Sequence, residues 1–170
     1  MGTKASPPAN CKIVNCQIVK FNRVLLGLEH IDSNRIAAID SEGGVLRYRD
    51  ISDLTARLQE QIPERALCFL LVENNVGGIA WVMSMLAARK LVPLVLNVKT
   101  EETLLNQLRD TYRPTYICAP AAFSCATGTA KEKAWGYTLY ETENPLCELH
   151  PDLSHLLPTS GSTGSPKLVR

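Results

Sequence analysis

The sequence lacks an excess of charge of either sign. Its 18 lysines and arginines are nearly balanced by 17 aspartates and glutamates, which leaves a formal net charge of +1. Proteins that bind nucleic acid or an anionic membrane surface through their overall charge carry a clear basic excess. The composition therefore gives no reason to expect nucleic acid or a membrane surface as a partner.

The sequence also lacks a hydrophobic run long enough to cross a bilayer. A spanning helix needs about 20 predominantly apolar residues, and the longest apolar stretch here, around residues 79–88, is shorter and interrupted. No signal segment with a basic start and an apolar centre opens the chain. Because 45% of the residues are hydrophobic and 21% are charged, the composition is that of an ordinary globular protein. We expect a cytoplasmic location.

Six cysteines are present, but their spacing fits no metal site. There is no C-x-x-C pair, and the three histidines lie outside any zinc-binding pattern. Cys68 and Cys118 lie inside apolar runs, where a free cysteine acts as a small buried hydrophobic residue. We therefore expect reduced thiols and assign no metal ligands.

The middle of the chain alternates between short apolar runs and longer helical patterns. Residues 66–72 are apolar throughout, which is typical of a strand buried on both faces of a parallel sheet. This order predicts a doubly wound, largely parallel α/β sheet with flanking helices. The predicted strands are 66–72, 91–96 and 115–119, and the predicted helices are 76–89 and 101–110.

The ends of these elements carry their own signals. Either Asn74 or Asn75 is suited to cap the helix at 76–89, and Thr100 to cap the helix at 101–110. Pro93 suggests an end or an irregularity within the second strand.

The flanking regions follow less regular patterns. Residues 35–40 and 45–48 predict a hairpin around a Gly-Gly pair, and a helix beginning at Asp50 or Ser52 carries apolar residues at fourfold spacing. The other expectations are disorder at 1–10, a short helix at 24–31, a surface loop at 121–134 and a strand at 135–140.

The most informative segment is T-S-G-S-T-G-S-P-K, at residues 159–167. Small residues let a backbone bend and approach a ligand closely. Free N–H groups and hydroxyls in such a run form a concave nest for an anion, and Lys167 adds a positive charge. The segment predicts a phosphate-binding loop. It is not a Walker A loop, because Pro166 precedes the lysine and Leu168 follows it.

A flexible linker is the alternative interpretation of a run rich in glycine, serine and threonine. The fixed Ser-Pro-Lys order at 165–167 and the apolar residues at 153–157 are unusual in a linker. We therefore prefer the phosphate-binding loop.

The residue order T-S-G-S-T-G-S-P-K resembles the phosphate-binding loop of the adenylate-forming (AMP-binding) superfamily. This superfamily includes acyl-CoA synthetases, the adenylation domains of nonribosomal peptide synthetases, and luciferases. Two weaker segments precede the loop in the family's order. Residues 46–51 (L-R-Y-R-D-I) resemble its L-T-Y-x-E-L segment, and residues 86–94 (L-A-A-R-K-L-V-P-L) resemble its L-A-x-x-A-G-x-x-x-V-P-L turn. Arg89-Lys90 replaces the usual Ala-Gly, which suggests a divergent subfamily.

The resemblance implies an enzyme that joins a carboxylic acid to ATP, giving an acyl-adenylate and pyrophosphate. The acyl group then passes to the thiol of CoA or of a carrier-protein phosphopantetheine arm. Mg²⁺ would bridge phosphate oxygens, and the catalytic residues would lie beyond Arg170, so no catalytic residue is assigned here. The residues implied to hold the ATP phosphates are Thr159, Ser160, Gly161, Ser162, Thr163, Gly164 and Lys167.

The resemblance also implies that residues 11–170 are an incomplete N-terminal subdomain of the adenylate-forming fold. Because almost nothing follows Lys167, we expect residues 160–170 to be mobile and the chain alone to be inactive. Two alternatives stay open at this point. One is a non-catalytic nucleotide- or phosphate-binding module, and the other is an interaction domain whose serine- and glycine-rich run is only a tail.

Overall fold

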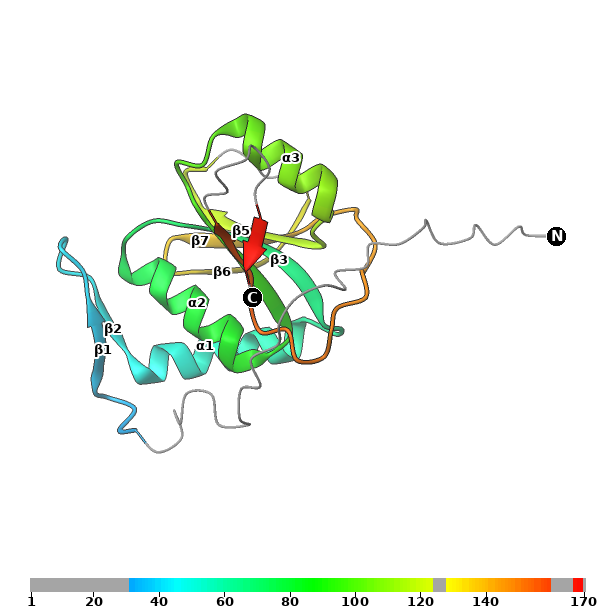
Figure 1. Ribbon diagram of the computed structural model, residues 1–170. Coiled ribbons are helices and arrows are strands. Elements are labelled where there is room, and N and C mark those ends of the chain that lie inside the picture. Colours follow the sequence, from blue (N-terminus) through cyan, green and yellow to red (C-terminus); the bar gives the residue numbers. More distant parts are fainter. Residues whose placement is uncertain (1–30, 124–127, 160–166, 170) are drawn as a thin grey trace.

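The computed structural model describes residues 31–123, 128–159 and 167–169 (Figure 1). The expected disorder at 1–10 lies outside these residues, as does the expected helix at 24–31 except for Ile31. None of the helices in the described part of the chain has the length and apolar character that a membrane crossing requires.

A five-stranded mixed sheet of order β4-β3-β5-β7-β6 forms the centre of the fold. Strand β3 pairs in parallel with β4 from Ala66↔Leu91 to Val72↔Asn97, and with β5 on its other side. The prediction of three adjacent parallel strands is therefore confirmed. The strands are β3 (Ala66–Val72), β4 (Leu91–Asn97), β5 (Tyr116–Pro120), β6 (Thr129–Ala134) and β7 (Tyr137–Glu141).

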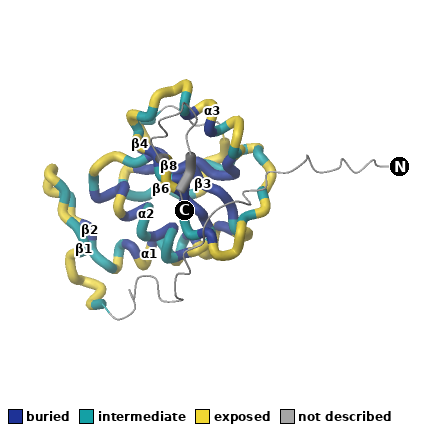
Figure 2. The backbone as a smooth tube through the Cα atoms, viewed as in Figure 1, coloured by how far each residue is buried: buried dark blue, intermediate teal, exposed yellow. Residues whose placement is uncertain are grey.

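Helices cover both faces of this sheet, as the doubly wound prediction requires. Helices α1 (Tyr48–Gln61) and α2 (Val76–Ala88) pack on one face, and α3 (Glu102–Tyr112) packs on the other. Alternate residues of β3 supply the two cores, so that Leu70 faces α2 and Phe69 faces α3. Figure 2 shows the resulting buried centre.

The antiparallel pair β6–β7 corrects the expected surface loop at 121–134, because residues 129–134 form an edge strand. Its sequence, Thr-Ala-Lys-Glu-Lys-Ala, is largely exposed and has no apolar face that would predict a strand. Its backbone ladder with β7 holds this strand, and Glu132 adds contacts to α1 by accepting a hydrogen bond from Gln61 (2.8 Å) and pairing with Arg57 (3.4 Å).

The expected strand at 135–140 begins two residues later than predicted. Trp135 (φ 54°) and Gly136 (φ 75°) have left-handed backbone conformations and form the two-residue hairpin turn between β6 and β7. The indole Nε1 of Trp81 in α2 donates to the carbonyl of Ala134 (3.0 Å), which fixes this hairpin against the helix.

The hydrogen bonds made by the residues at each helix start explain where α1, α2 and α3 begin. Helix α1 begins at Tyr48, earlier than predicted, because Asp50 is its third residue and accepts the N–H of Arg47 (2.7 Å).

Asn75 caps α2, as predicted, by accepting the N–H of Gly78 (2.9 Å). Thr100 does not cap α3: its N–H donates to Asn97 in a turn after β4, and the helix begins after Glu101.

A separate two-stranded sheet precedes the main one. Strands β1 (Ile36–Ile39) and β2 (Val45–Arg47) are antiparallel, which confirms the predicted hairpin. They pack beside the start of α2 through Leu46 and Val76 (Figure 1).

We predict that Gly77→Ala destabilises the fold although alanine favours helices. A Cβ at this position would lie 2.3 Å from the backbone oxygen of Trp135 and 2.8 Å from the ring of Tyr137. Overpacking of this kind costs roughly 1–3 kcal/mol of unfolding free energy, and the rigid backbone contact points to the upper end. Urea denaturation followed by circular dichroism measures the change.

Gly136→Ala is the matched control for Gly77→Ala. A Cβ there meets nothing within 4 Å, although φ is +75°, so only backbone strain of about 1 kcal/mol is expected. A Gly77→Ala variant as stable as Gly136→Ala would contradict the close packing of α2 on the β6–β7 hairpin.

Candidate functional site

The parallel strands point their carboxyl ends to one edge of the sheet, which we call the carboxyl edge. Val72, Asn97 and Pro120 end β3, β4 and β5 there. In open α/β sheets, ligands bind outside these ends, commonly where the strand order reverses. That point lies between β3 and β5, because the chain passes from β3 to β4 on one side and then crosses back to β5.

Tyr137, the first residue of β7, lies beside the end of β5, and its side chain reaches the end of β3. It pairs with Pro120 in the ladder and is only 2% exposed. Its hydroxyl accepts the N–H of Glu73 (2.9 Å) and donates to Oδ1 of Asn75 (3.4 Å). Burial raises the pKa of Tyr137 above its ordinary value, so the phenol stays neutral. A structural tyrosine thus fills the place where many α/β proteins hold a ligand.

The start of α2 is likewise occupied by the protein's own side chains. Helix N-termini attract anions, but here Val76 N–H donates to Asp40 (3.2 Å) while Asn75 caps the helix. The Asp40 carboxylate also accepts the N–H groups of Gly44 (2.7 Å) and Glu42 (3.1 Å). These bonds, led by that from Val76, lower the pKa of Asp40. Asp40 therefore serves as the anion at this helix end.

The outer side of β4 is joined by a segment that comes from the far side of the sheet. Residues 142–156, which we call the strap, connect β7 to the next strand along the chain. At the start of the strap, Thr142 Oγ1 donates to the carbonyl of Pro114 (2.8 Å). At its end, Leu156 makes a parallel bridge with Leu94.

The bridge between the strap and β4 explains why Pro93 does not interrupt the strand. The Pro93 carbonyl accepts the N–H of Leu156 (2.8 Å), and Val95 N–H donates to the Leu156 carbonyl (3.1 Å). Pro93 thus presents its backbone polar groups to the strap and not to β3, so its missing N–H costs the β3–β4 ladder nothing. The expected irregularity at Pro93 is not found, and β4 runs on to Asn97.

The predicted phosphate-binding segment follows directly from the strap. Strand β8 (Leu157–Thr159) continues parallel to β4, and therefore runs toward the carboxyl edge. It pairs with the antiparallel strand β9 (Lys167–Val169), so that Thr159 lies opposite Lys167. The backbone thus brings together the two ends of the nine-residue motif.

Strand β9 lies within residues 160–170, the segment expected to be mobile. The rest of that segment, 160–166 and 170, lies outside the described residues. Of the predicted site residues, the structure describes only the backbones of Thr159 and Lys167. The other five lie outside the described residues: Ser160, Gly161, Ser162, Thr163 and Gly164.

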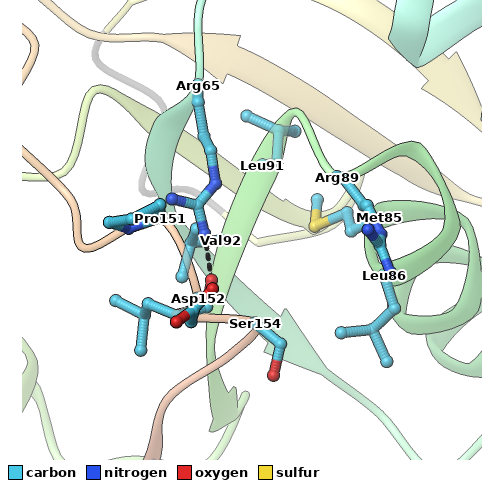
Figure 3. A pocket seen from close by; sticks show the side chains of 10 residues that line it. Arg65, Met85, Leu86, Arg89, Leu91, Val92, Pro151, Asp152 and Ser154 are labelled. Atoms are coloured by element: carbon cyan, nitrogen blue, oxygen red, sulfur yellow. Dashed lines mark hydrogen bonds between the residues drawn. The ribbon is translucent and has the colours of Figure 1, made fainter. Parts of the chain in front are cut away.

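A small pocket lies at the opposite, amino edge of the sheet, beside Leu91 (Figure 3). Its volume is about 110 Å³, and Arg65, Arg89 and Asp152 are among the side chains that line it. Pockets that hold drug-sized ligands measure about 300–1,000 Å³. This pocket is therefore too small for a nucleotide. The sequence did not predict this pocket, because Arg65 is held there by hydrogen bonds to backbone carbonyls of the strap, which leave no pattern in the sequence.

Comparison with known proteins identifies the fold. No family model matches the chain, and no curated protein matches it in sequence. The N-terminal subdomain of NpsA from Klebsiella oxytoca superposes with a TM-score of 0.56 at 18% identity, over 84% of this chain and 39% of that one. The o-succinylbenzoate coenzyme A synthetase MenE from Bacillus subtilis, solved in complex with AMP, gives 0.55 at 16%, over 84% and 40%.

A third structure agrees with these two. MenE from E. coli with bound OSB-AMS gives a TM-score of 0.55 at 18% identity, over 83% of this chain and 32% of that one. The chain thus has the fold of the N-terminal part of adenylate-forming enzymes, which confirms the resemblance at the level of the fold. It spans two fifths or less of the length of these neighbours.

We predict that Asp40→Asn reduces stability at neutral pH but not in acid. The folded pKa of Asp40 is below its ordinary value of 3.8, so the charged form contributes stability above that value and loses it as the pH falls through the folded pKa. The stability difference between wild type and variant should be full above about pH 5 and shrink toward zero below about pH 3. Urea midpoints across this range measure it.

Asp53→Asn, which removes an exposed carboxylate from α1, is the control for the loss of one surface charge. An Asp40→Asn difference that persists unchanged at the lowest pH would show that the Asp40 charge does not stabilise the start of α2.

Proposed function

We propose that this chain is the N-terminal portion of an ATP-dependent, carboxylate-activating ligase. The enzyme would join a carboxylic acid to ATP, release pyrophosphate, and pass the acyl group to the thiol of CoA or of a carrier-protein phosphopantetheine arm. The observation that carries this proposal is the pairing of Thr159 with Lys167. This pairing brings the two ends of the nine-residue motif together, as a phosphate-binding loop would require.

The donor groups of the motif suit the phosphates of ATP. When a carboxylate attacks the α-phosphorus, negative charge develops on the departing pyrophosphate and must be stabilised. Hydroxyls and backbone N–H groups donate hydrogen bonds, and the lysine supplies a full positive charge. The residues proposed to bind the β- and γ-phosphates are Thr159, Ser160, Gly161, Ser162, Thr163, Gly164 and Lys167.

Magnesium fits the same proposal as an ion bound to the nucleotide. Within the described residues, no three His, Cys, Asp or Glu side chains come together as a metal site. Mg²⁺ commonly keeps several waters and is bound largely through substrate phosphates. We therefore propose that it arrives with ATP and neutralises part of the phosphate charge, while the loop residues orient the phosphates.

The fold and the cysteines support the remaining parts of the proposal. One neighbour of the same fold is a coenzyme A synthetase solved with AMP, which supports both an adenylate and a thiol acceptor. Among the described residues, Cys68 is a buried free thiol, and reduced thiols are typical of the cytosol. We propose that the reaction takes place there.

We predict that Lys167→Ala and Gly161→Val both slow adenylate formation in the longer enzyme that this function requires. The first removes positive charge from the pyrophosphate, and the second prevents close approach of the backbone. Loss of one such stabilising group costs about 100-fold or more in kcat. Carboxylate-dependent exchange of labelled pyrophosphate into ATP is the assay.

Lys133→Ala is the matched control, because it removes an exposed lysine from β6 at the other end of the sheet. Equal exchange rates in Lys167→Ala, Lys133→Ala and wild type would exclude the motif as the phosphate site. They would favour a protein in which the segment is only a linker or a tail.

We predict that the 170-residue chain alone does not bind Mg-ATP in the micromolar range. It spans at most 40% of the neighbours named above, and the resemblance assigns the adenine and ribose contacts to later residues. Isothermal titration with Mg-ATP measures the affinity. Micromolar binding, or adenylate formed by this chain, would indicate a complete module and contradict the proposed division of the site.

A further inference from the structure

Arg65 links the start of β3 to the strap. It directly precedes β3, and its Nη1 donates to the carbonyl of His150 (2.7 Å) while its Nη2 donates to the carbonyl of Leu153. These partners are 85 and 88 residues away in the sequence. Figure 3 shows the guanidinium between the sheet and the strap, beside Pro151 and Asp152. One side chain thus holds two points of the strap at once.

The bond from Arg65 to Leu153 is partly buried, whereas the bond to His150 lies at the surface. The guanidinium is partly buried, which lowers the pKa of Arg65, while the charge of Asp152 raises it and that of Arg89 lowers it further. An arginine remains charged under all such conditions. Hydrogen bonds from a charged donor are about twice as strong as neutral ones, and they lose less strength where water is partly excluded.

The strap is also anchored from the other side by apolar contacts. Leu153 is 4% exposed and Leu156 is 0% exposed, and both belong to the core between the sheet and α3. We call the two hydrogen bonds from Arg65 to the strap the clamp. Leu153 takes part both in the clamp, through its carbonyl, and in the apolar anchor, through its side chain. Because Leu156 then pairs with β4, the position of Leu153 determines where β8 begins.

The path from Arg65 to the phosphate-binding segment is short. Residues 154–158 alone separate Leu153 from Thr159, and Leu156 within them is held by the hydrogen bonds to Pro93 and Val95. A shift of the strap at Leu153 would therefore disturb the bridge of Leu156 to Leu94, after which β8 carries Thr159. Errors of about 1 Å in the placement of binding groups are enough to reduce activity about 100-fold.

We propose that Arg65 is a positioning residue for the phosphate-binding loop. By fixing the strap at His150 and Leu153, it supports the bridge of Leu156 to Leu94 of β4, after which β8 begins, and hence the place of Thr159 and Lys167. The role in ATP binding rests on the proposed function, whereas the clamp itself can be tested without it.

Lysine is a poor substitute for arginine at this position. The planar guanidinium presents separate donors to two carbonyls, but an ammonium on a flexible stem is a single point of attachment. Arg65→Lys should therefore retain one of the two bonds and give an effect between wild type and Arg65→Ala.

Amide hydrogen exchange tests the clamp in the 170-residue chain. Exchange at Leu156 and Val95, whose N–H groups join the strap to β4, should accelerate at least tenfold in Arg65→Ala and less in Arg65→Lys. The amide of Val98, which donates to Val72 on the β3 side (3.1 Å), should not change. Unchanged exchange at Leu156, or equal acceleration at all three amides, would overturn the proposal.

Lys90→Ala is the matched control. Lys90 lies at the same amino edge and also donates to a backbone carbonyl, but its partner is Pro63, outside the strap (3.1 Å). Acceleration at Leu156 in this variant as large as in Arg65→Ala would show a general loosening of the amino edge, which contradicts a specific clamp.

Pyrophosphate exchange in the longer enzyme tests the effect on the loop. Arg65→Ala should raise the KM for Mg-ATP about tenfold, with the KM for the carboxylate unchanged, and Lys90→Ala should change neither. Arg65→Lys should give an intermediate KM, and it tests the proposal if the alanine variant does not fold.

A wild-type enzyme without exchange activity would refute the proposed function, while the amide exchange would still decide the clamp. Faster amide exchange with an unchanged KM for Mg-ATP would overturn the positioning role alone.

Discussion

The burial of β3 on both faces is the constraint on which the rest of the structure depends. A strand of seven residues with no polar face needs a partner strand on each side and a helix layer above and below. Strands β4 and β5, with their connecting helices, meet this need. The same arrangement aligns the carboxyl ends of three strands, and so creates the edge at which the candidate site is found.

The carboxyl edge has different neighbours next to β5 and next to β4, the two strands that flank β3. On the β5 side, β7 places Tyr137 over the ends of the strands, and its hydroxyl satisfies the backbone of Glu73. On the β4 side, the strap end and β8 approach the strand. The proposed phosphate-binding segment therefore lies on the β4 side, while the side chain of Tyr137 reaches from β7 to the end of β3.

The sequence was sufficient to predict those helices and strands whose apolar residues follow the pattern of burial in the core. Strand β3 and the helix at 76–89 were predictable for this reason. The assignment of residues 159–167 to phosphate binding rests on their residue order and stays a prediction. Strand β6 was not predictable, because this edge strand, held by its backbone ladder with β7, has no apolar face. The clamp at Arg65 was hidden for a different reason. Its partners are backbone carbonyls, which every residue carries, and only the fold brings them near.

A phosphate-binding loop needs fixed ends more than it needs a fixed interior. Ordering one residue costs about 1–2 kcal/mol of backbone entropy, and glycine and serine bury too little apolar surface to offset that cost. The pairing of Thr159 with Lys167 removes the freedom of the two ends before any ligand binds. That pairing is useful only if β8 itself is held, and β8 is held through Leu156 on β4. Under the proposed function, the glycine-rich segment would thus depend on contacts at the other edge of the sheet, where Arg65 fastens the strap.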